Sequence, residues 1–243
     1  MNMKVEGRNP VLELFDSNLK IDKIYMQKDS EDKILSAIIR RAKGNNIAVK
    51  RIPWSRLKDL AETGNSQGVV AFTEDLNFYS PDDLLELAKE RDESPFVVIL
   101  DQIQDPHNLG AIIRTSFAAG VHGVIFPDRR ACGITPAVIK SSAGAALHLP
   151  LARVTNINYT LDQLKDKGMW IAAADTEGSQ VYYDCDLKGS LGIVVGSEGS
   201  GLRRLVRENC DFLLKIPMEG EIGSLNASVA AGIIIFEALR QRS

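Results

Sequence analysis

The sequence predicts an α/β protein with a small mixed α/β domain (residues 1–76), a linker (residues 77–94) and a larger parallel-sheet domain (residues 95–243). Its length allows this division, because 243 residues exceed the usual domain size of about 100–150 residues. The pattern supports it, because strand-length and helix-length segments alternate in both parts. An apolar fraction of 44% and a charged fraction of 25% are typical of a globular protein.

The first 76 residues alternate between helical and extended patterns. We expect a helix over residues 11–15, after Asn9-Pro10, and a second where Ile34, Leu35, Ile38 and Ile39 recur at helical spacing. Strands are expected at residues 21–26, 47–52 and 69–73. A polar loop bounded by glycine, residues 63–68, precedes the last strand.

Residues 77–94 are charged and weakly amphipathic, with Leu84, Leu85 and Leu87 among acidic and basic side chains. We expect a helix that connects two domains. The alternative is a surface helix within a single domain.

The pattern changes at Pro95 to short apolar runs separated by helix-length segments. The runs are residues 96–100, 123–126, 169–174, 191–195 and 212–216. The expected helices are residues 109–119, 135–143, 160–167, 202–209 and 227–239. Strands that are apolar on both faces belong in a parallel sheet covered by helices on both sides.

Several classes of protein are disfavoured by composition. No signal-peptide pattern or membrane-spanning run is visible, so we expect a cytoplasmic protein with no membrane association. Three cysteines without a CxxC pair suggest neither a disulfide framework nor a zinc site, and no metal is expected. Residues 1–76 carry 13 basic against 11 acidic residues, and the remainder 16 against 21, so any nucleic-acid surface must be a local patch.

Three polar or glycine-rich segments follow predicted strands, where ligands bind in parallel sheets. After the first strand, residues 101–110 lead into a helix that carries Arg114, whose guanidinium suits phosphate or carboxylate. The alternative is helix capping by Asn108 and a surface arginine.

The second segment, residues 196–201, lets a ligand approach the backbone. Because Gly201-Leu202-Arg203 replaces the Gly-Lys-Ser/Thr of a phosphate-binding loop and GxGxxG is not matched, nucleotide triphosphate and dinucleotide sites lose support. A glycine turn with Glu198 at a helix start is the alternative.

The third segment, residues 217–226, ends in Ser224 and Asn226 before an apolar helix, so capping is again the alternative to a site. A fourth glycine-rich stretch, residues 141–150, has small side chains that would admit a flat ligand.

Together these segments resemble the SpoU (TrmH) family of the SPOUT superfamily, the RNA ribose 2′-O-methyltransferases. The resemblance rests on three stretches in order, which are Asn108-Leu-Gly-Ala-Ile-Ile-Arg114, Ile193 to Leu202 and Ile216 to Ser228. The opening Glu6-Gly-Arg-Asn-Pro-Val-Leu-Glu13 is similar to that of the small RNA-binding domain of ribosomal-RNA members, which itself resembles a large-subunit ribosomal protein. Within the family, the sequence resembles the RlmB-type enzymes.

The resemblance implies S-adenosyl-L-methionine as cofactor, a deep trefoil knot and a homodimer formed through the knotted domain. Its implied substrate is a guanosine ribose in the peptidyl-transferase loop of 23S ribosomal RNA. Transfer RNA, or the ribosomal site of antibiotic-resistance members, is the alternative within the family. A ribosomal-RNA-binding assembly factor without catalysis is the alternative from another class, but it predicts damaged motifs and none is visible.

The resemblance also implies roles for individual residues. Cofactor contacts are expected from Gly196, Ser197, Ile216, Met218, Leu225 and Gly144. The implied catalytic residues are Arg114, Asn108, Glu198, Ser224 and Asn226. Because an arginine side chain is a very weak acid that stays protonated at neutral pH, we expect Arg114 to stabilise the forming alkoxide and dock a phosphate rather than remove the proton.

Basic side chains of the first 76 residues are candidates for RNA contacts, with ordinary solvated arginines as the alternative. The expected contacts are Arg8, Asn9, Arg40 and Arg41, followed by Arg51 and Arg56.

Overall fold

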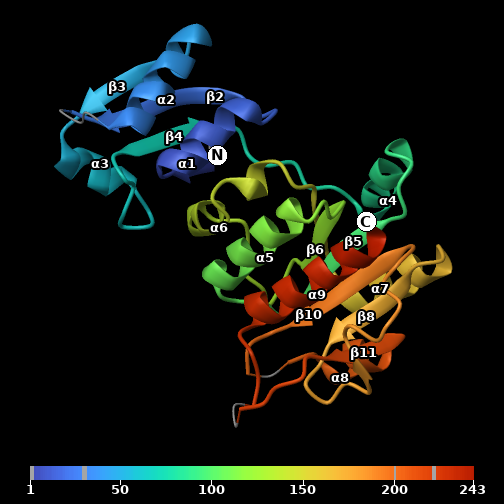
Figure 1. Ribbon diagram of the computed structural model, residues 1–243. Helices are drawn as coiled ribbons and strands as arrows, with labels where there is room; N and C mark the ends of the chain where they lie inside the picture. The colour runs from blue at the N-terminus through green and yellow to red at the C-terminus, as the bar shows by residue number, and fades with distance from the viewer. Residues whose placement is uncertain (1–2, 29–31, 200, 221–222) are drawn as a thin grey trace. The chain divides into compact units, whose positions relative to one another are not determined.

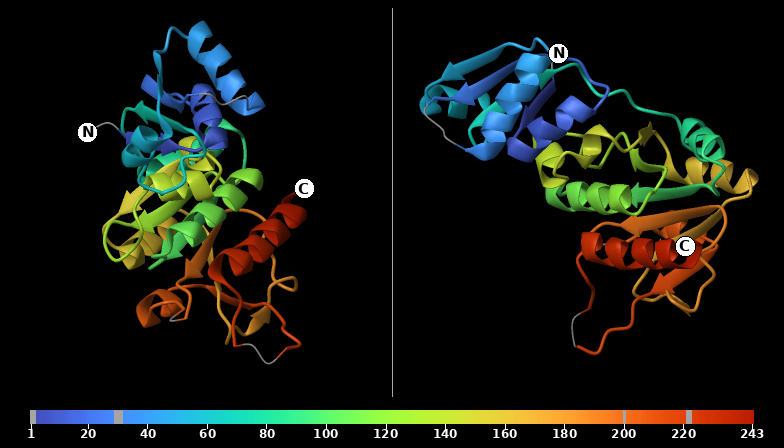
Figure 2. Two further views of the ribbon diagram at one scale, coloured as in Figure 1. Left: turned by 90° about the vertical axis from the view of Figure 1, so that its left-hand side faces the viewer. Right: turned by 45° about the horizontal axis from the view of Figure 1, so that its top comes forward.

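The computed structural model describes residues 3–28, 32–199, 201–220 and 223–243, and shows two compact units (Figures 1 and 2). The first consists of Met1–Asn77 and Ile134–His148, and the second of Phe78–Gly133 and Leu149–Ser243. Among the described residues, no helix has the length and apolar character needed to cross a membrane.

The first unit contains a four-stranded sheet in the order β1-β4-β2-β3. Its strands are β1 (Met3–Glu6), β2 (Ile21–Gln27), β3 (Val49–Ile52) and β4 (Val69–Thr73). The β2–β3 pair is parallel and the other pairs are antiparallel. The helices are α1 (Arg8–Glu13), η1 (Leu14–Asp16), α2 (Lys33–Gly44), α3 (Trp54–Leu60), α6 (Pro136–Ser141) and η2 (Ala145–Leu147).

The predicted elements of the first unit are confirmed, but the sequence prediction missed β1 and α3. Four residues are too few to display the alternation of an edge strand such as β1. The α3 helix buries only Leu57, so it lacks the recurrent apolar face that identifies a helix in sequence.

The second unit is built on a seven-stranded sheet in the order β7-β6-β5-β10-β8-β11-β9 (Figure 1). Every neighbouring pair is parallel, as the continuous apolar runs predict. The strands are β5 (Phe96–Asp101), β6 (Gly123–Pro127), β7 (Leu151–Val154), β8 (Trp170–Ala174), β9 (Gln180–Val181), β10 (Leu191–Gly196) and β11 (Phe212–Lys215). The sequence prediction missed the short outer strands β7 and β9.

Helices cover both faces of this sheet. They are α4 (Pro81–Glu90), α5 (Pro106–Ala118), α7 (Ile157–Asp166), α8 (Arg204–Glu208) and α9 (Ala227–Arg242). Leu84 of α4, Leu161 of α7 and Val206 of α8 share one buried cluster with Val97 and Ile99 of β5. The α5 and α9 helices pack against each other and cover the sheet through β6, β8 and β10. The charged stretch that holds α4 therefore contributes Leu84 to the core of the second unit.

Strand β10 lies in the middle of the sheet, paired with β5 on one side and β8 on the other. Gly192 makes this close packing possible, since a Cβ there would lie 2.8 Å from Ile99 Cδ1 and 2.9 Å from Ile171 Cδ1. The carboxyl ends of β5, β10, β8 and β11 consequently meet at one edge, where a parallel sheet binds its ligands.

Candidate active site

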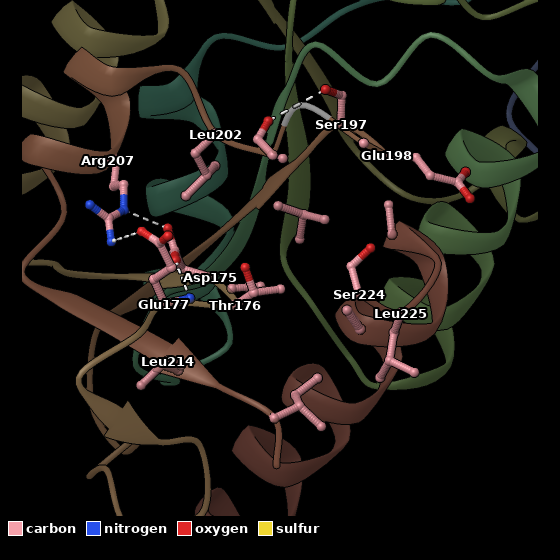
Figure 3. Close-up of a pocket in the computed structure, with 18 of the residues that line it drawn as sticks. Asp175, Thr176, Glu177, Ser197, Glu198, Leu202, Arg207, Leu214, Ser224 and Leu225 are labelled. Carbon is pink, nitrogen blue, oxygen red and sulfur yellow. Dashed lines mark hydrogen bonds and ion pairs between the residues drawn. The ribbon is translucent and has the colours of Figure 1, made fainter. Parts of the chain in front are cut away.

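A cleft of about 460 Å³ opens at the carboxyl ends of β8, β10 and β11 (Figure 3). Its walls come from residues 174–177, the loop after β10, the segment after β11 and the start of α9. Apolar side chains of Leu202, Leu214, Ile216 and Leu225 line it together with backbone and acidic groups. The cleft therefore offers a surface for a flat apolar ring beside groups that form hydrogen bonds.

The glycines of the loop after β10 close it into a tight turn. The amide of Ser197 donates to the carbonyl of Gly201 at 3.0 Å, and the amide of Gly201 donates to the carbonyl of Ser197 at 2.9 Å. A Cβ on Gly196 would lie 2.5 Å from the carbonyl carbon of Gly201, and Gly201 has a φ of +64°. Any larger residue at Gly196 would therefore force this wall of the cleft apart.

A buried carboxylate fixes the end of the same loop. Asp101, the last residue of β5, is 0% exposed. Its oxygens accept from the backbone amide of Arg203 at 2.9 Å and from the Arg203 Nε at 2.7 Å. Because a buried charge that loses its partner is strongly destabilising, this ion pair ties the loop after β10 to β5.

Asp175, Thr176 and Glu177 form a wall of the cleft that the sequence prediction missed. Asp175 Oδ1 accepts from the Glu177 amide at 2.8 Å, and Asp175 Oδ2 accepts from Arg207 Nε at 2.7 Å. This hydrogen bond raises the pKa of Arg207 above its ordinary value. The sequence could have indicated this wall, because residues 175–177 follow the carboxyl end of the strand predicted at residues 169–174.

Three of the predicted catalytic residues form one hydrogen-bonded network. The side-chain amide of Asn108 donates to Glu198 Oε2 at 2.9 Å. The side-chain amide of Asn226 donates to Asn108 Oδ1 at 2.9 Å and to Glu198 Oε2 at 3.3 Å. Glu198 also lines the cleft, on the side opposite Asp175 and Arg207 in Figure 3. The network therefore presents oriented polar groups at the edge of the cleft.

Asn226 also caps α9, so one side chain combines helix capping with membership of the network. Its Oδ1 accepts hydrogen bonds from the Ser228 amide at 2.9 Å and the Val229 amide at 3.4 Å. Its Nδ2 donates to Asn108 within the network. Capping uses the oxygen and the network uses the nitrogen.

The two other predicted catalytic residues lie outside this network. Ser224 lines the cleft. Arg114 lies on α5 six residues after Asn108, and its exposed side chain makes no hydrogen bond or ion pair within the described ranges. A guanidinium in that state is available to an external anion.

Five of the six predicted cofactor residues line the cleft, namely Gly196, Ser197, Ile216, Met218 and Leu225. Gly144 belongs to the first unit instead. It has a φ of +96°, and a Cβ there would lie 2.8 Å from the Cβ of Glu13. The close approach of α1 is therefore a structural reason for glycine at this position.

The candidate RNA contacts of the first unit divide into paired and free side chains. Arg8 donates to the carbonyl of Gln67 at 3.0 Å and to Asp32 at 2.6 Å. Arg41 donates to Asp16 at 2.7 Å, which lowers the pKa of that carboxyl and raises the pKa of Arg41. Four exposed residues make no side-chain hydrogen bond or ion pair within the described ranges, namely Asn9, Arg40, Arg51 and Arg56.

Known protein families and relatives resemble this chain over almost its whole length. A family model described as the SpoU rRNA Methylase family matches residues 95–236. A second, described as RNA 2′-O ribose methyltransferase substrate binding, matches residues 4–79. YacO of Bacillus subtilis, assigned to the TrmH family of tRNA/rRNA methyltransferases, is 43% identical over 239 residues, which cover 98% of this chain and 96% of YacO.

Two solved structures also resemble the chain. The SpoU methyltransferase AviRb from Streptomyces viridochromogenes, in complex with the cofactor AdoMet (S-adenosylmethionine), has a TM-score of 0.80 at 26% identity. The alignment covers 99% of this chain and 90% of AviRb. An AdoMet-bound rRNA methyltransferase from Sinorhizobium meliloti has a TM-score of 0.78 at 25% identity, over 98% of this chain and 87% of that protein.

The ion pair of Asp101 leads to a first prediction. In Asp101→Asn the loop after β10 loses its charged anchor, so affinity for S-adenosylmethionine should fall about tenfold, as measured by calorimetry. The control is Glu86→Gln, the same kind of change in an exposed ion pair with Lys89 on α4, which should leave affinity unchanged. Equal affinities in both variants would contradict the anchoring role.

Proposed function

This chain belongs to the SpoU (TrmH) family of S-adenosylmethionine-dependent RNA 2′-O-ribose methyltransferases, and we propose that it methylates a guanosine ribose in the peptidyl-transferase loop of 23S ribosomal RNA. The observation that carries the ribose chemistry is the hydrogen-bonded network of Asn108, Glu198 and Asn226 at the edge of the cleft. These groups orient a hydroxyl without needing to change their own charge.

Two observations favour ribosomal over transfer RNA. Residues 4–79 match a substrate-binding family model, and such a domain is generally absent from the transfer-RNA type. An rRNA methyltransferase from Sinorhizobium meliloti also covers 98% of this chain.

The proposed site of action is the cytoplasm. The proposed division is residues 1–76 for RNA binding, residues 77–94 as linker and residues 95–243 for catalysis, and the family models at 4–79 and 95–236 support it.

The cleft fits S-adenosylmethionine in shape and chemistry. Gly196 and Ser197 contribute backbone groups to its wall, Ile216, Met218 and Leu225 offer an apolar surface to adenine, and Glu177, whose carboxylate lies 3.5 Å from Arg207, adds an acidic group. We propose Gly196, Ser197, Ile216, Met218 and Leu225 as the binding residues, whereas Gly144, which belongs to the first unit, stays a prediction from the resemblance. When bound, the cofactor supplies an electrophilic methyl group.

The residues of the chain must then align the ribose and stabilise its 2′-oxygen. We propose that Asn108, Glu198, Ser224 and Asn226 hold the ribose and that Arg114 stabilises the developing alkoxide and docks the adjacent phosphate. The unpaired state of Arg114 within the described ranges supports this role. Its guanidinium is charged at neutral pH, so electrostatic stabilisation is favoured over proton abstraction.

We propose that the catalytic domain contains the deep trefoil knot of the family. The strand order supports it, because β10 enters the sheet between β5 and β8 after the chain has already built strands on either side. The proposed knotted loops are residues 141–149, 196–201 and 216–226.

For RNA binding we propose a surface on the first unit. Asn9 and Arg40 are exposed, while Arg8 and Arg41 are held by Asp32 and Asp16. Arg8 and Arg41, which carboxylates already hold in place, lose less conformational entropy when RNA binds. Asn9 and Arg40 are available to contact phosphates.

A homodimer through the catalytic domain is the proposed assembly, with Val229 and Phe236 at the interface. Both lie on one face of α9, seven residues apart, and are 50% and 48% exposed. We expect sedimentation at micromolar concentration to give the mass of a dimer, and Phe236→Asp to give that of a monomer because a charge is excluded from an apolar interface. A monomeric wild-type protein would contradict the proposal.

The role of Arg114 is tested by Arg114→Ala, which should lower kcat about 100-fold or more and change S-adenosylmethionine affinity less than twofold. Arg114→Lys should retain more activity than alanine, because it keeps the positive charge. Arg91→Ala, at another exposed arginine of the second unit, serves as the control. Parallel losses of kcat and cofactor affinity would show that Arg114 supports the cleft instead.

The substrate is tested by mapping 2′-O-methyl groups on ribosomal RNA from cells with and without this protein. We expect one guanosine methylation in the peptidyl-transferase loop to disappear and to return on expression of the wild-type protein but not Arg114→Ala. Loss of a transfer-RNA methylation with intact ribosomal RNA would redirect the assignment within the family. Unchanged maps of both RNAs would overturn the proposed activity.

A further inference from the structure

We propose that a polar cavity beside the cofactor cleft holds the unpaired base of the target nucleotide, an inference that rests on the proposed function. The cavity measures about 390 Å³ and is lined by residues 102–105, Asn108, Ser197 and Glu198. That volume lies within the range of small-ligand sites, about 300–1,000 Å³. Every lining residue belongs to the second unit.

The position of the cavity matches the path of a nucleotide through the site. Ser197 and Glu198 line both the cavity and the cofactor cleft, so the two spaces share a wall. The hydrogen bond from Asn108 to Glu198 lies at this wall. A nucleotide that directs its ribose oxygen toward the cofactor extends its base away from it, and the cavity is the adjoining space.

The chemistry of the lining suits a base better than a phosphate. The side chains include the carboxylates of Asp105 and Glu198, the amides of Gln102, Gln104 and Asn108, and the hydroxyl of Ser197. None of the described lining residues is cationic, whereas phosphate sites rely on Arg, Lys or clustered amide donors. Amides and carboxylates recognise the hydrogen-bonding edge of a base that is free of its pairing partner.

Gln102 and Gln104 are the side chains in this cavity with hydrogen-bonding capacity to spare. Neither side chain makes a hydrogen bond within the described ranges, although each amide can both donate and accept. Gln102 is half-buried, with a φ of +61° that is unfavourable for a residue with a Cβ. Residues held in such conformations cluster at functional sites, and here the backbone holds a free amide at a cavity.

The remaining polar groups are already committed to the fold. Asp105 accepts from the amides of His107 and Asn108 as the cap of α5, and Glu198 accepts from Asn108 and Asn226. These partners hold the cavity in shape. Base selection is therefore expected to depend on Gln102 and Gln104.

The test compares Gln102→Gly and Gln104→Ala with the wild-type protein. Glycine at position 102 removes the side chain and keeps the positive φ without strain. The control is Gln163→Ala on α7, a half-buried glutamine without a side-chain hydrogen bond in the described ranges and outside the cavity. The substrates are ribosomal RNA transcripts that carry each of the four bases, or inosine, at the methylated position.

We expect each cavity variant to lower kcat/KM about tenfold on the native transcript and to reduce discrimination among bases by a similar factor. S-adenosylmethionine affinity should change less than twofold, and Gln163→Ala should behave as wild type. Base discrimination that is unchanged in both cavity variants would overturn the inference. A wild-type protein that methylates no ribosomal RNA would instead overturn the proposed function, and the inference with it.

Discussion

The buried carboxylate of Asp101 is the constraint on which the functional part of the molecule depends. With no exposure, its charge must be paired, and Arg203 supplies both a backbone amide and a guanidinium nitrogen. Because Asp101 ends β5 and Arg203 is the N-cap of α8, the pairing fixes the end of the loop after β10 just before α8 begins. Ser197 and Glu198, the wall shared by the cleft at the strand ends and the polar cavity, lie in the loop held in this way.

The central strands of the second unit can be predicted from sequence because burial under helices on both faces makes β5, β6 and β10 almost continuously apolar, with Asp101 at the end of β5 as the polar exception. The short outer strands β7 and β9 lack such a continuous apolar run. The rule that ligands bind at the carboxyl ends of parallel strands identifies the loops after β5, β10 and β11 as candidate site segments. Asp175 also follows a strand end, but its side chain is held by Arg207, which lies 32 residues further along the chain and which local patterns do not connect with it. The membership of residues 134–148 in the first unit depends on contacts as remote as Lys140 with Asn65, which local patterns do not contain.

Asn226 shows why helix capping and membership of the hydrogen-bonded network need not be alternatives. An amide has an accepting end and a donating end, and this one directs its oxygen to the first amides of α9 and its nitrogen to Asn108 and Glu198. Aspartate could cap the helix equally well but could not donate to a carboxylate. Serine or threonine would be too short to do both. The residue type is therefore explained by the combination of the two duties and by neither alone.

The double duty of Asn226 also couples the network to the start of α9. Asn226 follows every strand of the sheet along the chain, and its side chain is oriented only once α9 has begun to form. A partly folded molecule can therefore possess the loop after β10 and still lack a complete network. The network is therefore complete only where the first turn of α9 and the loop after β10 are both in place.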